Sequence, residues 1–180
     1  LGGPADKRVF AALRAAAGAI LVVAETVRTE RYRPAPVPVV VVTRSCALDL
    51  DGPLFGGGGA RPVVVTIDSA PASARARVAD VADVIVAGTT TVDLALALDA
   101  LGRRGITSVL SEGGPSLGGQ LAAAGLLDEL CLTLAPALVS GPAVRIIAGA
   151  ALVPPTHLAL HSACEEDGYL FLAYRPVPAR

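Results

Sequence analysis

Residues 107–126, TSVLSEGGPSLGGQLAAAGL, place an apolar run, a glycine-rich turn and an amphipathic stretch in direct succession. The run at 107–110 is typical of a buried strand. Pro115 suits the first position of a helix, which we expect over residues 115–126. A strand that leads straight into a helix is the unit from which parallel α/β sheets are built. This stretch therefore predicts an α/β fold, provided that the unit recurs along the chain.

Short β-branched apolar runs do recur, at residues 19–23, 38–43, 62–67, 83–87 and 129–134. Most of them lack alternation with polar residues, as expected for strands buried on both faces of a parallel sheet. Helical patterns at 6–17 and 92–104 lie between runs of this kind. Right-handed crossovers through such helices predict a three-layer α/β/α domain with a mostly parallel sheet.

The last third of the chain changes character. Apolar and polar or small residues alternate at 157–161 and again at 169–174, and Asp167-Gly168 between them is typical of a tight turn. We expect an antiparallel hairpin that closes a mixed sheet. No repeat or domain boundary interrupts the pattern, so residues 1–180 are expected to form a single domain.

Composition excludes several classes of protein. The chain is 53% hydrophobic, but its longest segment without Asp, Glu, Lys or Arg, residues 146–164, contains two prolines and two histidines. A spanning helix needs about 20 mostly apolar residues, so no membrane segment is expected. A net charge of −1 argues against a nucleic-acid surface. The widely spaced Cys46, Cys131 and Cys164 form no disulfide framework, which favours the cytoplasm.

Polar or glycine residues follow four of the predicted strands, at 25–26, 43–45, 88–90 and 111–114. In open α/β sheets, ligands bind beyond the carboxyl ends of the strands. The convergence of these residues at one sheet edge therefore predicts a site for a small molecule.

Two of these strand ends suit phosphate groups. The turn from Gly113 to Gly119 opens a helix whose free N–H groups could hold a diphosphate, although an ordinary glycine turn with a helix cap would look the same. Thr43, Arg44 and Ser45 stand where an acidic residue would favour NAD. Arg44 could instead hold a 2′-phosphate, and a solvated surface arginine is the alternative.

Metal and thiol chemistry are not expected. His157 and His161 are four residues apart on a predicted strand, with no third ligand nearby in the sequence. Cys131 lies inside an apolar run and is predicted to be a small buried hydrophobe.

Several short motifs, in a fixed order, resemble those of one family: GGPAD at 2–6, LR at 13–14, TVRTE at 26–30, TRS at 43–45, EGGPSL at 112–117 and LDEL at 127–130. Their order and spacing resemble the pyrimidine reductases of riboflavin biosynthesis. These enzymes form the C-terminal half of bifunctional deaminase–reductases and also occur alone. The resemblance covers essentially the whole chain. It implies a dihydrofolate-reductase-like fold, NADPH as cofactor, and hydride transfer that converts a ribosylamino-pyrimidine 5′-phosphate to its ribitylamino product.

The resemblance also implies site residues. Arg14 and Glu112 match positions that contact the substrate, and no nucleophile or metal is implied. A homodimer is expected, since dimers are common in the family. The matches to positions that contact the cofactor are Thr26, Glu30, Ser45, Gly114, Pro115, Ser116, Leu117, Gly118, Gly119 and Gln120.

Two departures from the family keep alternatives open. Glu25 stands where many members have glycine, and a leading strand with a Ser-Leu-Asp-Gly-type motif is expected before residue 1. A dihydrofolate-type reductase and a nucleotide-binding module without catalysis are the alternatives to the pyrimidine reductase. The sequence leaves open whether the base is an amino-uracil or a diamino-pyrimidinone.

Overall fold

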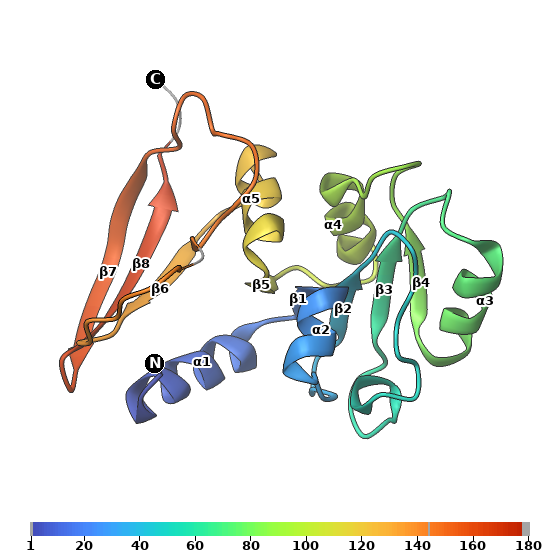
Figure 1. Ribbon diagram of the computed structural model, residues 1–180, viewed down its shortest axis with the longest axis horizontal. Helices are drawn as coiled ribbons and strands as arrows, with labels where there is room; N and C mark the ends of the chain where they lie inside the picture. Colours follow the sequence, from blue (N-terminus) through green and yellow to red (C-terminus); the bar gives the residue numbers. More distant parts are fainter. Residues whose placement is uncertain (1, 144, 178–180) are drawn as a thin grey trace.

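The computed structural model describes residues 2–143 and 145–177. Its strands form two sheets (Figure 1), a five-stranded parallel sheet in the order β4-β3-β2-β1-β5 and a three-stranded antiparallel sheet in the order β6-β8-β7. The parallel strands are β1 (Ala19–Val23), β2 (Val39–Val42), β3 (Val63–Thr66), β4 (Asp83–Val86) and β5 (Val109–Gly113). The antiparallel strands are β6 (Leu130–Leu134), β7 (Leu158–Glu166) and β8 (Tyr169–Pro176).

Helices cover both faces of the parallel sheet. Four helices lie beside the parallel sheet: α2 (Ala24–Glu30), α3 (Ala72–Val81), α4 (Leu94–Gly102) and α5 (Pro115–Ala123). The first helix, α1 (Pro4–Ala16), contacts β8 of the antiparallel sheet, and a short 3₁₀ turn, η1, spans Pro53–Phe55. Alternate residues of each strand join different cores. In β2, Val39 and Val41 belong to the core beside α3, whereas Val40 belongs to the core beside α4 and α5. This two-sided burial is the reason that the strand sequences show no alternation.

The predicted α/β class is confirmed, with differences at element ends. The helix predicted at 92–104 is observed as Leu94–Gly102, because the Asp93 carboxylate caps it by accepting the Leu96 N–H at 3.0 Å. The strand predicted at 107–110 is observed at Val109–Gly113 and thus includes Glu112. The sequence reading missed α2 and α3; α3 lacks a broad apolar stripe, and Val78 is its one buried residue.

The C-terminal hairpin is confirmed, but it does not close a mixed sheet. β8 pairs with β6 on one side and with β7 on the other, all antiparallel. β6 was expected in the parallel sheet. Its leucines alternate with Cys131 and Thr133, a period of two that suits a half-exposed antiparallel strand. Cys131 is exposed on this strand, so the prediction that it is buried is wrong.

Across the described ranges 2–143 and 145–177, no helix combines the length and apolarity that crossing a bilayer requires.

Candidate functional site

A cavity of about 600 Å³ lies at the carboxyl ends of the parallel strands. We call it the strand-end cavity. Its volume falls within the range of small-molecule sites. It is lined by Val23, Ala24, Glu25, Val42, Thr43, Arg44, Ser45, Ile67, Pro71, Thr90 and Ser116. Residues from all five parallel strands or the segments after them thus meet at one edge. The sequence predicted this convergence for four of the strands and did not include the end of β3.

Four of the predicted cofactor residues, Thr43, Arg44, Ser45 and Ser116, line the strand-end cavity directly. The Thr43 N–H donates to the Val65 carbonyl at 3.0 Å, which ties this residue to the end of β3. Thr43 is buried, and Arg44 is exposed. The cavity therefore has hydroxyl groups on its walls and one cationic side chain at its surface.

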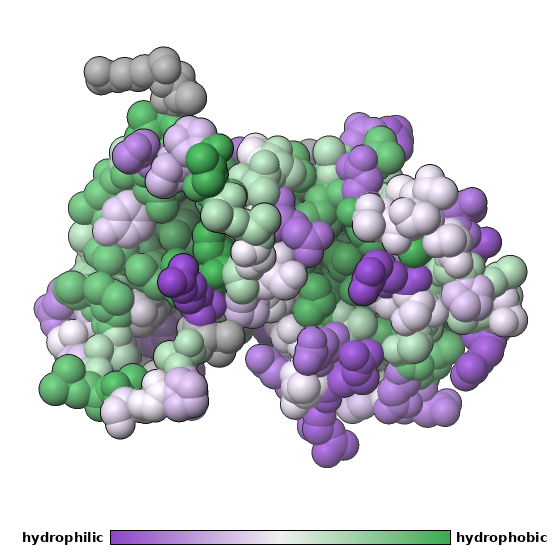
Figure 2. Space-filling view, turned by 45° about the horizontal axis from the view of Figure 1, so that its top comes forward, coloured by the Kyte–Doolittle hydropathy of each residue, from purple (hydrophilic) through white to green (hydrophobic). Residues whose placement is uncertain are grey.

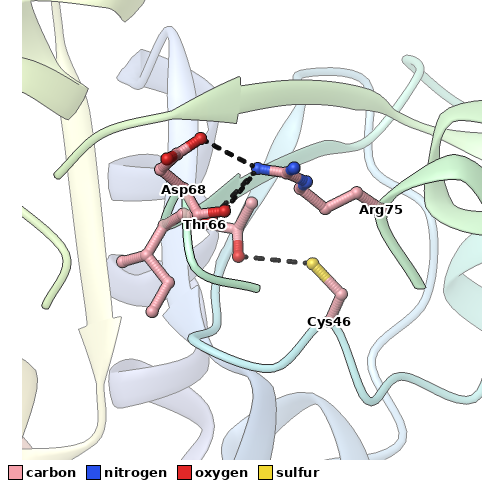
Figure 3. A network of polar contacts seen from close by, with 5 residues as sticks. Cys46, Thr66, Asp68 and Arg75 are labelled. Carbon is pink, nitrogen blue, oxygen red and sulfur yellow. Dashed lines mark hydrogen bonds and ion pairs between the residues drawn. The ribbon is translucent and has the colours of Figure 1, made fainter. Parts of the chain in front are cut away.

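Polar contacts near the ends of β2 and β3, of which the one between Cys46 and Thr66 is buried, hold the segment that carries Thr43, Arg44 and Ser45 (Figure 3). Cys46 follows these residues with a left-handed φ of 53°, and its thiol lies 3.3 Å from the Thr66 hydroxyl at the end of β3. Next to it, Arg75 of α3 donates to the Asp68 carbonyl at 2.8 Å. Cys46 and Arg75 thereby fasten the ends of β2 and β3 beneath the cavity.

The glycine-rich turn connects β5 to α5. Gly113 has a φ of +116°, a backbone conformation that residues with a Cβ atom rarely adopt. A Cβ on Gly114 would lie 3.8 Å from the Thr26 hydroxyl, so the turn runs beside α2. Pro115 occupies the first turn of α5. The predicted residues Thr26, Gly113, Gly114 and Pro115 are therefore neighbours near the cavity.

Residues further along α5 have other surroundings. Leu117 is buried in the core beside α4, and the Gln120 side chain donates to the Ser116 carbonyl at 3.2 Å. A Cβ on Gly119 would lie 2.1 Å from the Ala148 carbonyl oxygen. The Gly118–Gly119 pair thus lets the chain around residues 146–148 lie directly on α5. Of the stretch 114–120, Ser116 is the residue that lines the strand-end cavity.

Arg14 and Glu112, the two predicted substrate residues, contact each other. The Arg14 Nε and Nη2 atoms lie 2.6 and 2.5 Å from the two carboxylate oxygens of Glu112, a two-pronged ion pair. The hydrogen bonds that Arg14 donates to Glu112 are the main cause that raises the pKa of Arg14. The Glu112 side chain is 3% exposed and that of Arg14 is 38% exposed. The arginine is thus the member of the pair that solvent reaches.

Tyr32 completes this cluster, and the sequence analysis did not identify it. Its hydroxyl donates to the Glu112 Oε2 at 2.6 Å. Burial is the main cause that raises the pKa of Tyr32, and the hydrogen bond to Glu112 adds to it. Tyr32 also lines a second cavity, of about 360 Å³, between α2 and η1. The one signal in the sequence was an aromatic residue in a chain with 3% aromatics.

A β-bulge aims Glu112 at this cluster. β1 pairs Leu21 with Ser111 but Val22 with Gly113, so Glu112 is the extra residue on β5. Bulges re-aim side chains and are common next to active sites. Glu30, another predicted cofactor residue, is exposed at the end of α2, close enough to Tyr32 to raise its pKa slightly. Glu30 does not line the strand-end cavity.

The two histidines belong to the C-terminal part of the chain, one within β7 and one directly before it. His161 stands at a register shift in β7, and His157 precedes that strand. Within the described part of the chain, no three His, Cys, Asp or Glu side chains gather in a way that could hold a metal ion.

Several known proteins are similar to this chain. A family model described as the RibD C-terminal domain matches residues 1–168. A 2,5-diamino-6-ribosylamino-4(3H)-pyrimidinone 5′-phosphate reductase from Aquifex aeolicus is 32% identical over 145 residues, which cover 76% of this chain and 65% of that protein. The protein of the same name from Methanothermobacter thermautotrophicus is 33% identical over 156 residues, 82% of this chain and 72% of that one.

Among solved structures, a pyrimidine reductase-like protein from Corynebacterium diphtheriae matches with a TM-score of 0.85 and 27% identity. The match covers 99% of this chain and 83% of that chain. Both sheets therefore have a counterpart in an experimentally determined fold.

Proposed function

Because the chain belongs to the RibD C-terminal domain family, the pyrimidine reductases of riboflavin biosynthesis, we propose that it is an NADPH-dependent reductase. The proposed reaction reduces the ribosyl group of a ribosylamino-pyrimidine 5′-phosphate to a ribityl group. The observation that carries this proposal is the strand-end cavity, where Arg44 and four hydroxyl side chains meet at the carboxyl edge of a parallel sheet.

The residues of the cavity fit a phosphorylated dinucleotide. Arg44 would hold the 2′-phosphate through charge-assisted hydrogen bonds, and Thr43, Ser45 and Ser116 supply hydroxyl groups for ribose and phosphate oxygens. When bound, NADPH supplies the hydride. The protein contributes the position of the cofactor, since Thr43 and the apolar lining residues Val23 and Val42 form the walls of this open cavity.

The proposed substrate site lies around Arg14. This side chain is partly exposed while Glu112 holds two of its nitrogen atoms. A fixed guanidinium suits the phosphate of the substrate. The names of the two relatives at 32% and 33% identity favour the diamino-pyrimidinone over the amino-uracil as the base.

Cofactor binding tests the first half of the proposal. We expect wild-type protein to bind NADPH at least about tenfold more tightly than NADH, and Arg44→Ala to remove that preference by weakening NADPH alone. Arg104→Ala is the control, because Arg104 precedes β5 and therefore lies toward the amino ends of the strands, away from the strand-end cavity. Equal affinities for NADPH and NADH in the wild type would contradict the cofactor assignment.

Turnover tests the second half. The decrease in reduced-nicotinamide absorbance is followed with the diamino-pyrimidinone ribosyl phosphate, the amino-uracil ribosyl phosphate and dihydrofolate in parallel. We expect the first of these to be reduced fastest. Binding of NADPH without oxidation by any of the three would favour a nucleotide-binding module, for which the exposed Glu25 in the cavity is the motivating feature.

We also propose that two copies of the chain associate through the antiparallel sheet. Large apolar side chains are exposed on or next to its strands, and Figure 2 shows hydrophobic surface gathered on the side of the molecule that carries them. They are Leu134, Leu158, Leu160, Leu170 and Val177. Contiguous apolar surface of this kind marks interaction sites, and the expected dimer of the family would cover it.

A further inference from the structure

Tyr32 owes its position to a reversal at the end of α2. Arg31 adopts a left-handed conformation with φ 50° and ψ 56°, and the Tyr32 N–H then donates to the Val27 carbonyl at 3.2 Å. This turn directs the following residue back against the sheet, and Tyr32 is 8% exposed. A tyrosine buried in this way needs a partner for its hydroxyl.

That partner is the carboxylate of Glu112. The Tyr32 hydroxyl lies 2.6 Å from Oε2, the oxygen that also accepts from the Arg14 Nη2. With Oε1 bound to the Arg14 Nε, both carboxylate oxygens have partners within the protein. The Glu112 side chain is 3% exposed. The carboxylate of Glu112 is therefore enclosed by Arg14 and Tyr32, and it fixes both of them.

The cluster leaves one side of the Arg14 guanidinium available. Nε and Nη2 face Glu112, whereas Nη1 makes no hydrogen bond to any described residue. The guanidinium carbon also lies 4.7 Å from the ring centroid of Phe10 and 5.6 Å from that of Tyr32. Such contacts restrain an otherwise flexible side chain. The Nη1 side of Arg14 is thus held in a defined direction before any ligand arrives.

We propose that Tyr32 is a positioning residue of the substrate site, which with Glu112 fixes Arg14 so that its Nη1 presents N–H groups to the phosphate of the substrate. The proposal rests on the proposed function and deepens it. Tyr32 lies outside the motifs by which the chain resembles its family. Its role is to restrict Glu112 to one rotamer, which in turn restricts the guanidinium.

The charged groups that face Tyr32 come from three elements: Glu112 on β5, Arg14 on α1 and Glu30 on α2. Burial and the two carboxylates raise the pKa of Tyr32, while Arg14 opposes them. The phenol is therefore protonated at neutral pH and remains a donor to Glu112.

Steady-state kinetics of Tyr32→Phe test the role, because the substitution removes the hydroxyl and keeps the ring. We expect kcat/KM for the ribosylamino-pyrimidine phosphate to fall about tenfold, the effect of losing one hydrogen bond to a charged group, mostly through a higher KM. The Kd of NADPH should stay within about twofold. Tyr174→Phe on β8 is the matched control and should leave both constants unchanged.

A readout without substrate tests the contact itself. We expect the tyrosinate absorbance of Tyr32, isolated as the difference between wild type and Tyr32→Phe, to emerge at lower pH in Glu112→Gln. Tyr32→Phe and Glu112→Gln should also be non-additive, by about tenfold in the unfolding equilibrium constant. An unshifted titration with additive effects would overturn the proposal by showing that the contact does not exist in solution.

The outcomes separate this proposal from the function on which it rests. An active wild type with unchanged kcat/KM in Tyr32→Phe would overturn the positioning role and leave the reductase assignment intact. If the wild type binds the pyrimidine phosphate without reducing it, the reductase assignment fails. The positioning role is then supported by about tenfold weaker binding in Tyr32→Phe, and overturned by equal binding. A wild type that neither binds nor reduces the compound would overturn both.

Discussion

The parallel and the antiparallel sheet differ most in the burial of β3 and β7. Every residue of β3 is buried, whereas every residue of β7 is exposed. Leu160 on β7 is 55% exposed, while Leu21 on β1 is 2% exposed. The difference lies in which elements pack against the strands. Helices of the same chain lie on both faces of the parallel sheet (Figure 1), and the described residues supply no such cover for β7.

This contrast assigns different tasks to the two sheets. The parallel sheet contributes the strand ends that form the strand-end cavity. The antiparallel sheet contributes none of the lining residues, and its connection to the rest includes an exposed ion pair between Arg8 on α1 and Glu166 on β7. The parallel sheet thus carries the proposed ligand site, and the antiparallel sheet carries the surface that we propose for a second copy.

The largest expected effect is the loss of folding when a charge enters the parallel sheet. Val41 is 0% exposed, so Val41→Asp buries a carboxylate without a partner, at a cost of several kcal/mol. This is comparable with the whole stability of a typical domain, about 5–15 kcal/mol. We expect no cooperative thermal transition by circular dichroism. A folded Val41→Asp with a melting temperature close to that of the wild type would erase the proposed contrast.

The same type of substitution in the antiparallel sheet should change association and not folding. Leu160→Asp places its charge in solvent, so we expect a cooperative thermal transition, together with a halved mass by light scattering after size exclusion. Leu96→Asp is the control, because Leu96 is 52% exposed on α4 and should keep the wild-type mass. A monomeric wild type, or a dimeric Leu160→Asp, would contradict the assigned interface.

Much of the parallel sheet and its edge could be predicted from the sequence, because the signals are local. Continuous valine runs indicate burial on both faces, and residues that follow parallel strands must share an edge. Thr43, Arg44 and Ser45 therefore line the cavity as expected. The pairing of β6 with β8 joins segments about forty residues apart, and the apolar run at 129–134 carries no information on its partner.

The Arg14 cluster was only half predictable. Motifs pointed to Arg14 and Glu112, but the direction of the Glu112 side chain depends on a bulge in the pairing of β1 with β5. The position of Tyr32 depends on the left-handed conformation of Arg31. An arginine in the sequence does not predict that conformation. Contacts that arise from such irregular backbone are set by the tertiary structure.

A moderate effect is expected from Cys46→Ala, which removes the contact with Thr66 beneath the cavity. The thiol is a weak donor, and its site is buried, so we expect a loss of about 1 kcal/mol in the free energy of unfolding, with several-fold weaker NADPH binding.

Cys131→Ala, at an exposed position of β6, is the matched control and should change stability by less than about 0.5 kcal/mol. Denaturant titration and NADPH binding measure both variants. Equal losses of stability and of NADPH binding in the two variants would contradict the expectation that the buried Cys46 matters more than the exposed Cys131.

The smallest effect concerns the ion pair between Arg175 on β8 and Glu129, whose Nε and Oε2 atoms are 2.9 Å apart. The hydrogen bond from Arg175 is the main cause that lowers the pKa of Glu129 in the folded chain. Because the pKa of Glu129 is lower in the folded chain than in the unfolded chain, where it is about 4.3, the ion pair stabilises the fold at pH values above that unfolded pKa. This stabilisation is lost as the pH falls through the folded pKa. Both side chains are substantially exposed, so Glu129→Gln should cost only about 0.5 kcal/mol near neutral pH. Melting temperatures of the two proteins should converge as the pH falls below about 4; a difference that grows toward low pH would reverse the sign assigned to this pair.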